Sequence, residues 1–487
     1  MSPTREDSPV QDKPVRDKPV RDNPAQDEPA QDTVLSELRA CLPERCLVTD
    51  PDMMESYRID RAMFCESGVP LAVVLPRETA HVSAVMRVAS SYDVPVVPQG
   101  ARSGLSGAAN AIEGCLVVSL ERMNEVLRVD VPNRYVVTQP GVMNADLSRQ
   151  VGKHGLFYPP DPSSWEFCSI GGNLATNSGG LCCVKYGVTT DYVLALEVVL
   201  ASGEVLRTGR NTVKGVAGYD LVRLFVGSEG SLGIITEATL RLRAETARPK
   251  TVAATFAGAE TAAAGVAEVT RSAVVPSLLE FMDQTSVRAV NAAFALGFDD
   301  NVGAVILAQS DAGDGAGDAE IEAIAAILSK AGAVDVVIAE DPAEGELLLQ
   351  ARRQVLTAFE ALGTTMIDDI CVPRDRLADL VAGVEVISEA QRLTIGIVGH
   401  AGDGNFHPTV VFDGSDDDEA RRAHQAFEDV MTLGLELGGT ITGEHGVGML
   451  KRKHLEAEIG DLGLRLHRDI KKALDPANIL NPGKVFT

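Results

Sequence analysis

Apolar and polar positions along the chain follow two periods, one typical of strands and one typical of helices. Leu71–Leu75 is apolar, Glu78–Tyr92 has helical spacing, and Val94–Val97 is apolar again. This order predicts strand, helix, strand. Further strands are predicted at Cys115–Ser119, Val193–Leu200, Val252–Phe256, Leu278–Met282, Val302–Gln309 and Val334–Ile338, with helices at Gly218–Phe225 and Ala319–Ala331. Strands alternate with amphipathic helices, which predicts an α+β second unit over residues 246–460.

The first 32 residues carry a five-residue repeat with proline at a fixed position. Proline removes helix hydrogen bonds, and the repeats hold too few apolar groups to offset the entropy of ordering. We therefore expect a disordered tail over residues 1–32. Residues 33–65 are expected to form a short helical lead-in to the first unit.

Two histidines lie on either side of an Asp-Gly pair between two apolar runs, Leu393–Val398 and Thr409–Phe412. Asp-Gly in this setting predicts a hairpin. With Asp403 and Gly404 at the centre of the turn, His400 would pair directly with His407. Their Cβ atoms would then be about 5 Å apart, so both imidazoles could reach one metal ion.

Glu444 is the candidate third ligand, because catalytic zinc is often held by two histidines and a carboxylate. The adjacent His445 is a candidate general base. Two structural alternatives stay open: the histidines can be a simple polar cross-strand pair, and the Gly-rich Glu-His segment can begin a helix.

Two glycine-rich tracts indicate close approach of the backbone to a ligand. Pro98–Gly107 can form a nest for phosphate oxygens or be an ordinary turn. Cys168–Gly187 combines many glycines with Ser, Thr and Asn side chains, which favours a large, partly phosphorylated cofactor. Neither tract has the spacing of a Rossmann or P-loop fingerprint.

Composition and net charge limit the possible partners and the location of the protein. The net charge of −25 argues against nucleic acid and anionic membrane as partners. The sequence has no long apolar window, so no transmembrane segment is expected. Its eight cysteines form no Cys-x-x-Cys pair, so iron–sulfur and structural zinc clusters are not expected. A reducing cytoplasm is the simplest location, with peripheral contact at the inner face of the membrane as the alternative.

Several motifs in order resemble a known family. Pro98–Gly107, Gly171–Gly187 and Phe225–Gly230 resemble the FAD-binding domain of the vanillyl-alcohol oxidase superfamily, the PCMH type. Gly399–His407, Thr442–Gly448 and the segment 481–484 resemble the FAD-linked oxidases that include cytochrome-type D-lactate dehydrogenases, glycolate oxidase flavin subunits and D-2-hydroxyglutarate dehydrogenases. The resemblance covers roughly residues 45–487.

The resemblance implies a two-part FAD-binding domain over residues 66–245, an α+β cap with an antiparallel sheet over 246–460, and a C-terminal helix and tail over 461–487 that returns to contact FAD. No histidine lies in the first loop, so FAD is expected to bind noncovalently. The implied cofactor-binding residues are Pro98, Gly100, Ala101, Arg102, Ser103, Gly104, Leu105, Ser106, Gly107, Gln139, Pro160, Ser169, Ile170, Gly171, Gly172, Asn173, Ala175, Thr176, Asn177, Gly180, Gly187, Glu229, Gly230, Gly233, Ile234, Ile235, Asn481 and Lys484.

The resemblance also implies the chemistry, oxidation of a small D-2-hydroxy acid to the 2-oxo acid. Arg352 would bind the substrate carboxylate, with Arg353 as the alternative. A divalent metal, zinc or else manganese, would be held by His400, His407 and Glu444, and His445 would accept the hydroxyl proton.

Leu356 and Ile367 stand where D-2-hydroxyglutarate dehydrogenases have polar and basic residues, which favours D-lactate over 2-hydroxyglutarate; glycolate is the other rival. With no haem or cluster motif, electrons would pass to an external quinone, cytochrome or flavoprotein. A homodimer and a noncatalytic metal- or flavin-binding module stay open.

Overall fold

The computed structural model describes residues 28–294, 298–299, 301–313 and 315–486. Most of the expected repeat tail lies outside these residues. The first helix, α1 (Glu28–Cys41), begins inside that expected tail, so the boundary at residue 32 is wrong. The sequence that follows the last repeat has helical periodicity, and the helix extends back from it into the final residues of the repeat.

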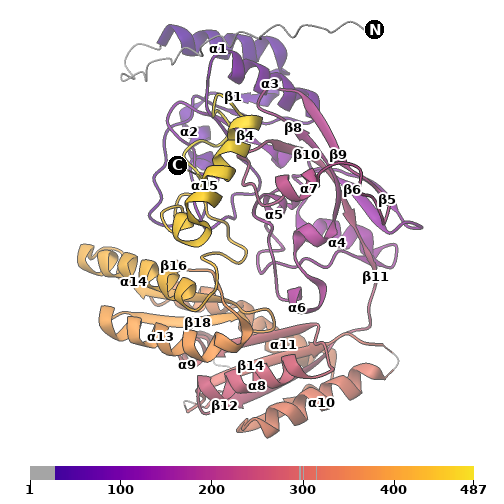
Figure 1. The fold of residues 1–487 in the computed structure, drawn as a ribbon, viewed down its shortest axis with the longest axis vertical. Helices are drawn as coiled ribbons and strands as arrows, with labels where there is room; N and C mark the ends of the chain where they lie inside the picture. Colours follow the sequence, from indigo (N-terminus) through magenta and orange to yellow (C-terminus); the bar gives the residue numbers. More distant parts are fainter. Residues whose placement is uncertain (1–27, 295–297, 300, 314, 487) are drawn as a thin grey trace, which may run out of the picture.

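The first unit contains two larger sheets and a two-stranded sheet of β7 (Leu156–Phe157) and β11 (Arg243–Ala244), and it includes the predicted strand–helix–strand segment (Figure 1). The segment consists of β2 (Ala72–Val74), α3 (Thr79–Ser91) and β3 (Val96–Gln99). The first sheet has the order β1-β2-β4-β3, with β2, β4 and β3 parallel. Its other strands are β1 (Leu47–Val48) and β4 (Leu116–Ser119).

The second sheet of this unit has the order β5-β6-β10-β8-β9 and is antiparallel. Its strands are β5 (Val126–Asp130), β6 (Tyr135–Thr138), β8 (Val193–Val199), β9 (Val205–Gly209) and β10 (Ile234–Arg241). Short helices lie beside it, namely α4 (Asn144–Gly152), α5 (Ile170–Thr176), α6 (Cys183–Tyr186) and α7 (Leu221–Phe225).

The second unit is built on a larger antiparallel sheet with the order β15-β12-β14-β13-β18-β19-β16. It contains every strand predicted for the cap. The strands are β12 (Lys250–Phe256), β13 (Leu278–Asp283), β14 (Ala304–Ser310), β15 (Asp335–Ile338), β16 (Thr364–Ile367), β18 (Thr394–His400) and β19 (Asn405–Phe412), and β17 (Ile370–Cys371) also pairs with β19.

Helices cover both faces of this sheet. One face packs in a common core with α8 (Ala259–Arg271), α10 (Ala316–Lys330), α13 (Leu377–Gln391) and α14 (Asp417–Glu436). The other packs against α9 (Gln284–Phe294), α11 (Pro342–Arg353) and α12 (Val355–Glu360). Side chains alternate between the faces along each strand. Val398 and Val411 belong to the second core, so His400 and His407 project from the same face.

The C-terminal segment returns to the first unit, as predicted. Helix α15 (Leu455–Leu474) lies beside the first unit in Figure 1, drawn in yellow next to the indigo strands. Beyond it, Leu480 forms a parallel bridge with Val96, and the Asn481 N–H donates to the Val96 carbonyl at 2.7 Å. The returning chain thus extends the first sheet beside β3 and brings its last residues to the first glycine-rich loop.

Candidate active site

A cavity of about 680 Å³ connects the two glycine-rich tracts of the first unit to the cap. This volume is in the range of protein sites for organic ligands. Seventeen of the residues implied for FAD line it, including both loops and the turn into β10. They are Pro98, Gly100, Ala101, Ser103, Gly104, Leu105, Ser106, Gly171, Gly172, Asn173, Ala175, Thr176, Glu229, Gly230, Gly233, Ile234 and Ile235.

The other implied residues do not line this cavity. They are Arg102, Gly107, Gln139, Pro160, Ser169, Ile170, Asn177, Gly180, Gly187, Asn481 and Lys484. Arg102 lies over the Tyr57 ring, with 4.5 Å from its guanidinium carbon to the ring centroid. The Gln139 side chain accepts a hydrogen bond from the Glu125 N–H at 3.0 Å. The side chains of these two residues thus have protein partners, and their contact with the cofactor stays a prediction.

Several of these residues hold the two glycine-rich tracts together. The Ser169 hydroxyl accepts hydrogen bonds from the N–H groups of Gly172 and Ala101, both at 3.2 Å, and so joins the two tracts. A Cβ at Gly100 would lie 2.5 Å from that hydroxyl. The glycine is therefore required for loop contact as well as for ligand approach. Lys484 donates to the Gly107 carbonyl at 3.1 Å and fixes the end of the first loop.

The cavity wall fits a cofactor with polar edges. The buried Asn173 amide nitrogen lines the cavity and has no hydrogen-bond partner within the described residues. Buried polar groups are normally paired, so this donor suits a ligand acceptor. Glu229 is also buried in the wall, and its carboxylate accepts from the N–H groups of Val447 and Gly448 at 2.8 and 2.9 Å. Burial raises the pKa of Glu229 to about 7.

The predicted hairpin forms, but its register differs from the prediction. The turn spans residues 401–404, so His400 pairs with Asn405 and His407 pairs with Val398. The longer turn arises because the N–H groups of Asp403 and Gly404 both donate to the His400 carbonyl. His400 and His407 are consequently diagonal neighbours rather than directly opposite. A shift by an even number of residues keeps both on one face, and their ring centroids are 5.3 Å apart.

Glu444 reaches both histidines. Its Oε1 lies 3.4 Å from His400 Nε2 and 3.2 Å from His407 Nε2. Burial alone would raise the pKa of Glu444, but the two imidazoles outweigh it and lower the pKa well below its ordinary value. Two imidazole nitrogens and a carboxylate oxygen converge from separate elements, which is a donor set suited to zinc. The three predicted ligands are therefore brought together.

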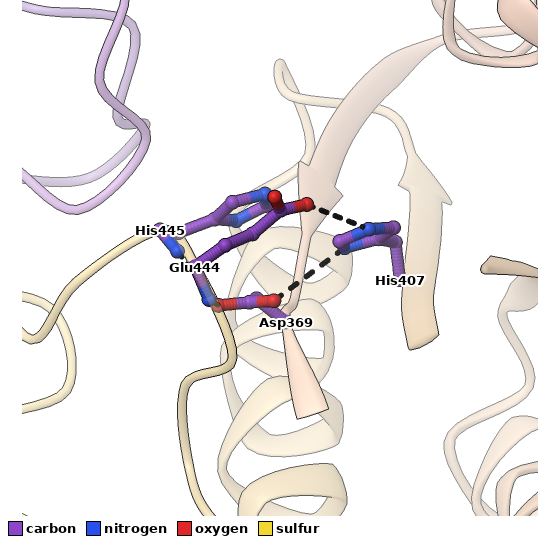
Figure 2. Close-up of side chains that lie close together, drawn as sticks. All are labelled: Asp369, His407, Glu444 and His445. Atoms are coloured by element: carbon purple, nitrogen blue, oxygen red, sulfur yellow. Dashed lines mark hydrogen bonds and ion pairs between the residues drawn. The ribbon is translucent and has the colours of Figure 1, made fainter. Parts of the chain in front are cut away.

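Asp369 belongs to the same cluster, although its role was not predicted. Figure 2 shows Asp369, His407, Glu444 and His445 facing one another, and their ligand atoms all lie within 4.8 Å. Asp369 Oδ2 accepts from the Thr442 hydroxyl and from the N–H groups of Glu444 and His445 at 2.7–2.8 Å. It thereby holds the segment that carries both functional side chains. The adjacent acidic pair 368–369 in a mainly apolar stretch was the available sequence signal.

His445 lines the cavity and stacks on His407, with ring centroids 5.0 Å apart and an interplanar angle of 8°. Burial lowers the pKa of His445 to about 4. The imidazole is therefore neutral near pH 7 and has the capacity to accept a proton. Its ring lies in the same cluster as His407, Glu444 and Asp369.

Arg352 is buried at the cap side of the same cavity, with 5% of its surface exposed. Its Nη2 lies 2.9 Å from Glu280 Oε2, yet Nε and Nη2 have no well-aligned hydrogen-bond partner within the described residues. These two nitrogens form one edge of the guanidinium, which matches the two oxygens of a carboxylate. Arg353 pairs with Glu346 at 2.8 Å and is more exposed. Leu356 and Ile367 also line the cavity.

Comparison with known proteins identifies the chain. Residues 70–209 match the FAD binding domain family, and residues 246–485 match the family described as FAD linked oxidases, C-terminal domain. The glycolate oxidase subunit GlcD of Bacillus subtilis (strain 168) is 43% identical over 420 residues, which cover 86% of this chain and 89% of that protein. The chain belongs to the FAD-linked oxidase family. The resemblance seen in the sequence is thus confirmed, and FAD is the cofactor that this family's domains bind.

This FAD-linked oxidase is also similar to the D-lactate dehydrogenase of Anaerostipes hadrus, with 35% identity over 468 residues that cover 93% of the chain and 97% of that protein. The structure of p-cresol methylhydroxylase with substrate bound has a TM-score of 0.77 at 17% identity, and covers 94% of this chain and 97% of that one. The predicted PCMH-type fold, with its FAD-binding unit and α+β cap, is confirmed. Within the described residues, no helix is both long and apolar enough to cross a membrane.

Proposed function

We propose that this FAD-linked oxidase converts a small D-2-hydroxy acid, with D-lactate as the first candidate, into the 2-oxo acid. The observation that carries the proposal is the position of Arg352. Arg352 lines the same cavity as Glu444, His407 and His445, and its buried Nε and Nη2 have no aligned hydrogen-bond partner among the described residues. The proposed carboxylate-binding group, Arg352, and the proposed proton- and metal-binding groups therefore line one cavity. The glycine-rich loops proposed to bind FAD line the same cavity.

Each residue supplies a separate part of the reaction. Arg352 binds the substrate carboxylate through two parallel N–H bonds and fixes the orientation of the adjacent carbon. His445 accepts the proton of the substrate hydroxyl, because it lines the cavity as a neutral imidazole with one unprotonated ring nitrogen. FAD supplies, when bound, the acceptor for the hydride that leaves the same carbon. Loss of one proton and one hydride converts the alcohol to a ketone, so the reaction is balanced.

His400, His407 and Glu444 are proposed to hold one divalent cation, zinc or alternatively manganese. The cation supplies Lewis acidity that lowers the pKa of a coordinated hydroxyl. Support comes from the donor set itself, since Glu444 Oε1 lies within 3.4 Å of both imidazole Nε2 atoms. Asp369 supports the site by accepting hydrogen bonds from the N–H groups of Glu444 and His445.

The shape of the cavity favours a substrate with a short or apolar tail. Leu356 and Ile367 supply apolar wall at the positions where a second carboxylate would need polar or basic partners. This disfavours D-2-hydroxyglutarate. Glycolate is the second candidate, because the 43% identical relative is named a glycolate oxidase subunit. The electron acceptor for the reduced flavin is proposed to be an external quinone, cytochrome or flavoprotein.

Anaerobic flavin reduction tests the function. The purified yellow protein is mixed with D-lactate, glycolate, D-2-hydroxyglutarate or NADH, and loss of flavin absorbance is followed. We expect rapid bleaching by D-lactate and little by D-2-hydroxyglutarate or NADH. Preferential bleaching by glycolate would identify glycolate as the substrate and leave the proposed type of reaction unchanged. A protein that binds FAD yet is bleached by none of the hydroxy acids would support the noncatalytic alternative.

A further inference from the structure

Glu280 connects two parts of the site that come from different elements. It lies on β13, and the antiparallel pairing of Phe281 with Gly399 places it beside His400 on β18. Its side chain is fully buried. One oxygen, Oε1, accepts a hydrogen bond from His400 Nδ1 at 2.6 Å, and the other, Oε2, lies 2.9 Å from Arg352 Nη2. A single carboxylate therefore contacts a candidate metal ligand and the candidate substrate-binding arginine.

The contact with His400 determines how its imidazole is presented. When Nδ1 carries the proton and donates to Glu280, the lone pair of Nε2 is left free on the opposite side of the ring. That nitrogen is the one that lies 3.4 Å from Glu444. A carboxylate behind a histidine fixes ring orientation and tautomer in metal sites generally.

The contact with Arg352 explains how a charged guanidinium can be buried in the cavity wall. A buried positive charge is costly unless a negative charge lies nearby. Glu280 supplies that charge at 2.9 Å, yet Arg352 Nε and Nη2 remain without an aligned hydrogen-bond partner among the described residues. The ion pair therefore stabilises the charge through Nη2, and Nε, the other nitrogen of that edge, contacts no acceptor among the described residues.

His407 has no equivalent support. Its Nδ1 is 3.7 Å from Asp369 Oδ1, which is too long for a hydrogen bond, and that nitrogen has no partner within the described residues. Asp369 instead accepts from the segment that carries Glu444 and His445. In the described part of the site, the two buried carboxylates thus have different roles, and only Glu280 touches both a histidine ring and an arginine.

We propose that Glu280 is a positioning residue that couples cation binding to substrate binding, by orienting His400 for the cation and Arg352 for the substrate carboxylate. This inference rests on the proposed function. Loss of the two Glu280 contacts must therefore weaken the binding of both ligands, although the residue itself is proposed to touch neither of them.

The test measures two binding equilibria on FAD-loaded protein without turnover. Zinc affinity is measured by competition with a chelator, and pyruvate affinity by perturbation of the flavin spectrum. Glu280→Gln is expected to weaken zinc binding about 10- to 100-fold, the usual effect of removing a supporting carboxylate, and to weaken pyruvate binding as well. Arg352→Met is expected to weaken pyruvate binding and leave zinc binding unchanged.

Asp283→Asn is the matched control. Asp283 is a buried carboxylate on the same strand, and it accepts from the Ser286 N–H at 2.8 Å, away from the cluster. Its replacement is expected to change neither zinc nor pyruvate affinity, even if it lowers thermal stability. A merely structural role for Glu280 predicts the same behaviour as Asp283.

The outcomes are separable. If the wild type binds zinc and pyruvate and Glu280→Gln keeps both affinities, or loses only one of them, this inference is overturned. The proposed function is then unaffected. A wild-type protein that binds neither zinc nor pyruvate would overturn both. If Glu280→Gln does not fold, Glu280→Asp replaces it in the same test. Aspartate keeps the charge but is one methylene too short to reach both His400 and Arg352. Full retention of both affinities in Glu280→Asp would overturn the inference.

Discussion

The imidazole of His445 lies parallel to that of His407, with 5.0 Å between the ring centroids. The stacking places a cavity-lining neutral imidazole directly beside a candidate metal ligand. Glu444 and His445 are neighbours on the 442–448 segment, so one short segment is proposed to contribute to both proton transfer and cation binding. This arrangement makes the two roles separable by substitution.

Replacement of His445 tests the base. His445→Ala is expected to retain FAD and zinc and to slow anaerobic flavin reduction by D-lactate about 10²- to 10⁴-fold, the usual contribution of a positioned general base. Stopped-flow absorbance provides the measurement. His154→Ala, at an exposed histidine, is the control and should reduce at the wild-type rate. Normal reduction of the His445→Ala flavin would show that another group takes the proton.

Replacement of His407 tests the cation site. His407→Ala removes one of the imidazoles that meet at Glu444, so the protein is expected to lose zinc on dialysis while it keeps FAD. Metal analysis by mass spectrometry gives the zinc content per chain. His154→Ala again serves as the control. Chelator treatment of the wild type should abolish flavin reduction and readdition of zinc or manganese should restore it; activity that survives complete metal removal contradicts the ligand assignment.

Arg352 and Arg353 form a natural pair for testing carboxylate binding. Arg352→Met removes charge-assisted hydrogen bonds, each worth about 1.5–3 kcal/mol, so KM for D-lactate is expected to rise at least about tenfold. Arg353→Met removes an arginine that is already paired with Glu346 and should change KM little. Steady-state kinetics with an artificial acceptor measures both. The reverse ranking would assign the carboxylate to Arg353.

Glu229 predicts a pH dependence of stability. Its pKa is about 7 in the folded protein, because burial disfavours the charged form, against an ordinary value of 4.5. A carboxyl whose folded pKa is raised contributes stability fully below its unfolded pKa and loses that contribution as the pH rises through the folded value. Relative to Glu229→Gln, the wild type should therefore lose up to about 3 kcal/mol between pH 4.5 and pH 8.

Thermal unfolding of the FAD-loaded proteins across this range provides the measurement for Glu229. Glu245→Gln, at an exposed glutamate, is the control and should follow the wild type. A wild-type Tm that does not fall relative to Glu229→Gln as the pH rises would show that the Glu229 carboxylate is adequately stabilised by the N–H groups of Val447 and Gly448.

Trp165 offers a direct probe of the cavity. It is the single tryptophan of the chain, and it lines the cavity together with the glycine-rich loops. Binding of FAD should quench its fluorescence in the apoprotein, and Ala101→Leu, which fills part of the same space without adding a second tryptophan, should weaken FAD binding. Fluorescence titration measures both effects. FAD binding that leaves Trp165 emission unchanged would place the cofactor elsewhere.

Much of the cap was predictable because its strands are apolar and its helices amphipathic. The strands from Val252 to Ile338 were found in this way, whereas β5 and β9 were missed because they are short and largely exposed, so their sequences lack an apolar run. The hairpin was predicted, but the number of residues in its turn was not. Asp-Gly signals a tight turn, and only the folded chain shows that Gly404 N–H reaches back to His400.

The site was predictable where its residues are close in sequence or belong to a recognised motif. His400, His407, Glu444 and His445 were found on both grounds. Glu280 and Asp369 were missed because their roles arise from contacts across the fold, over about 120 and 75 residues of chain. Glu280 lies in the middle of the otherwise apolar run 278–282, and an acid at such a position signals a buried charge that needs a partner.

The central claim is that Arg352, the three candidate metal ligands and His445 act on one hydroxy acid beside FAD. Anaerobic mixing of the zinc-loaded, FAD-loaded protein with D-lactate tests it most directly. The account predicts complete bleaching of the flavin with one pyruvate formed per flavin, and none after zinc removal. A flavin that stays oxidised with D-lactate, glycolate and D-2-hydroxyglutarate alike, in protein shown to contain the cation, would contradict it.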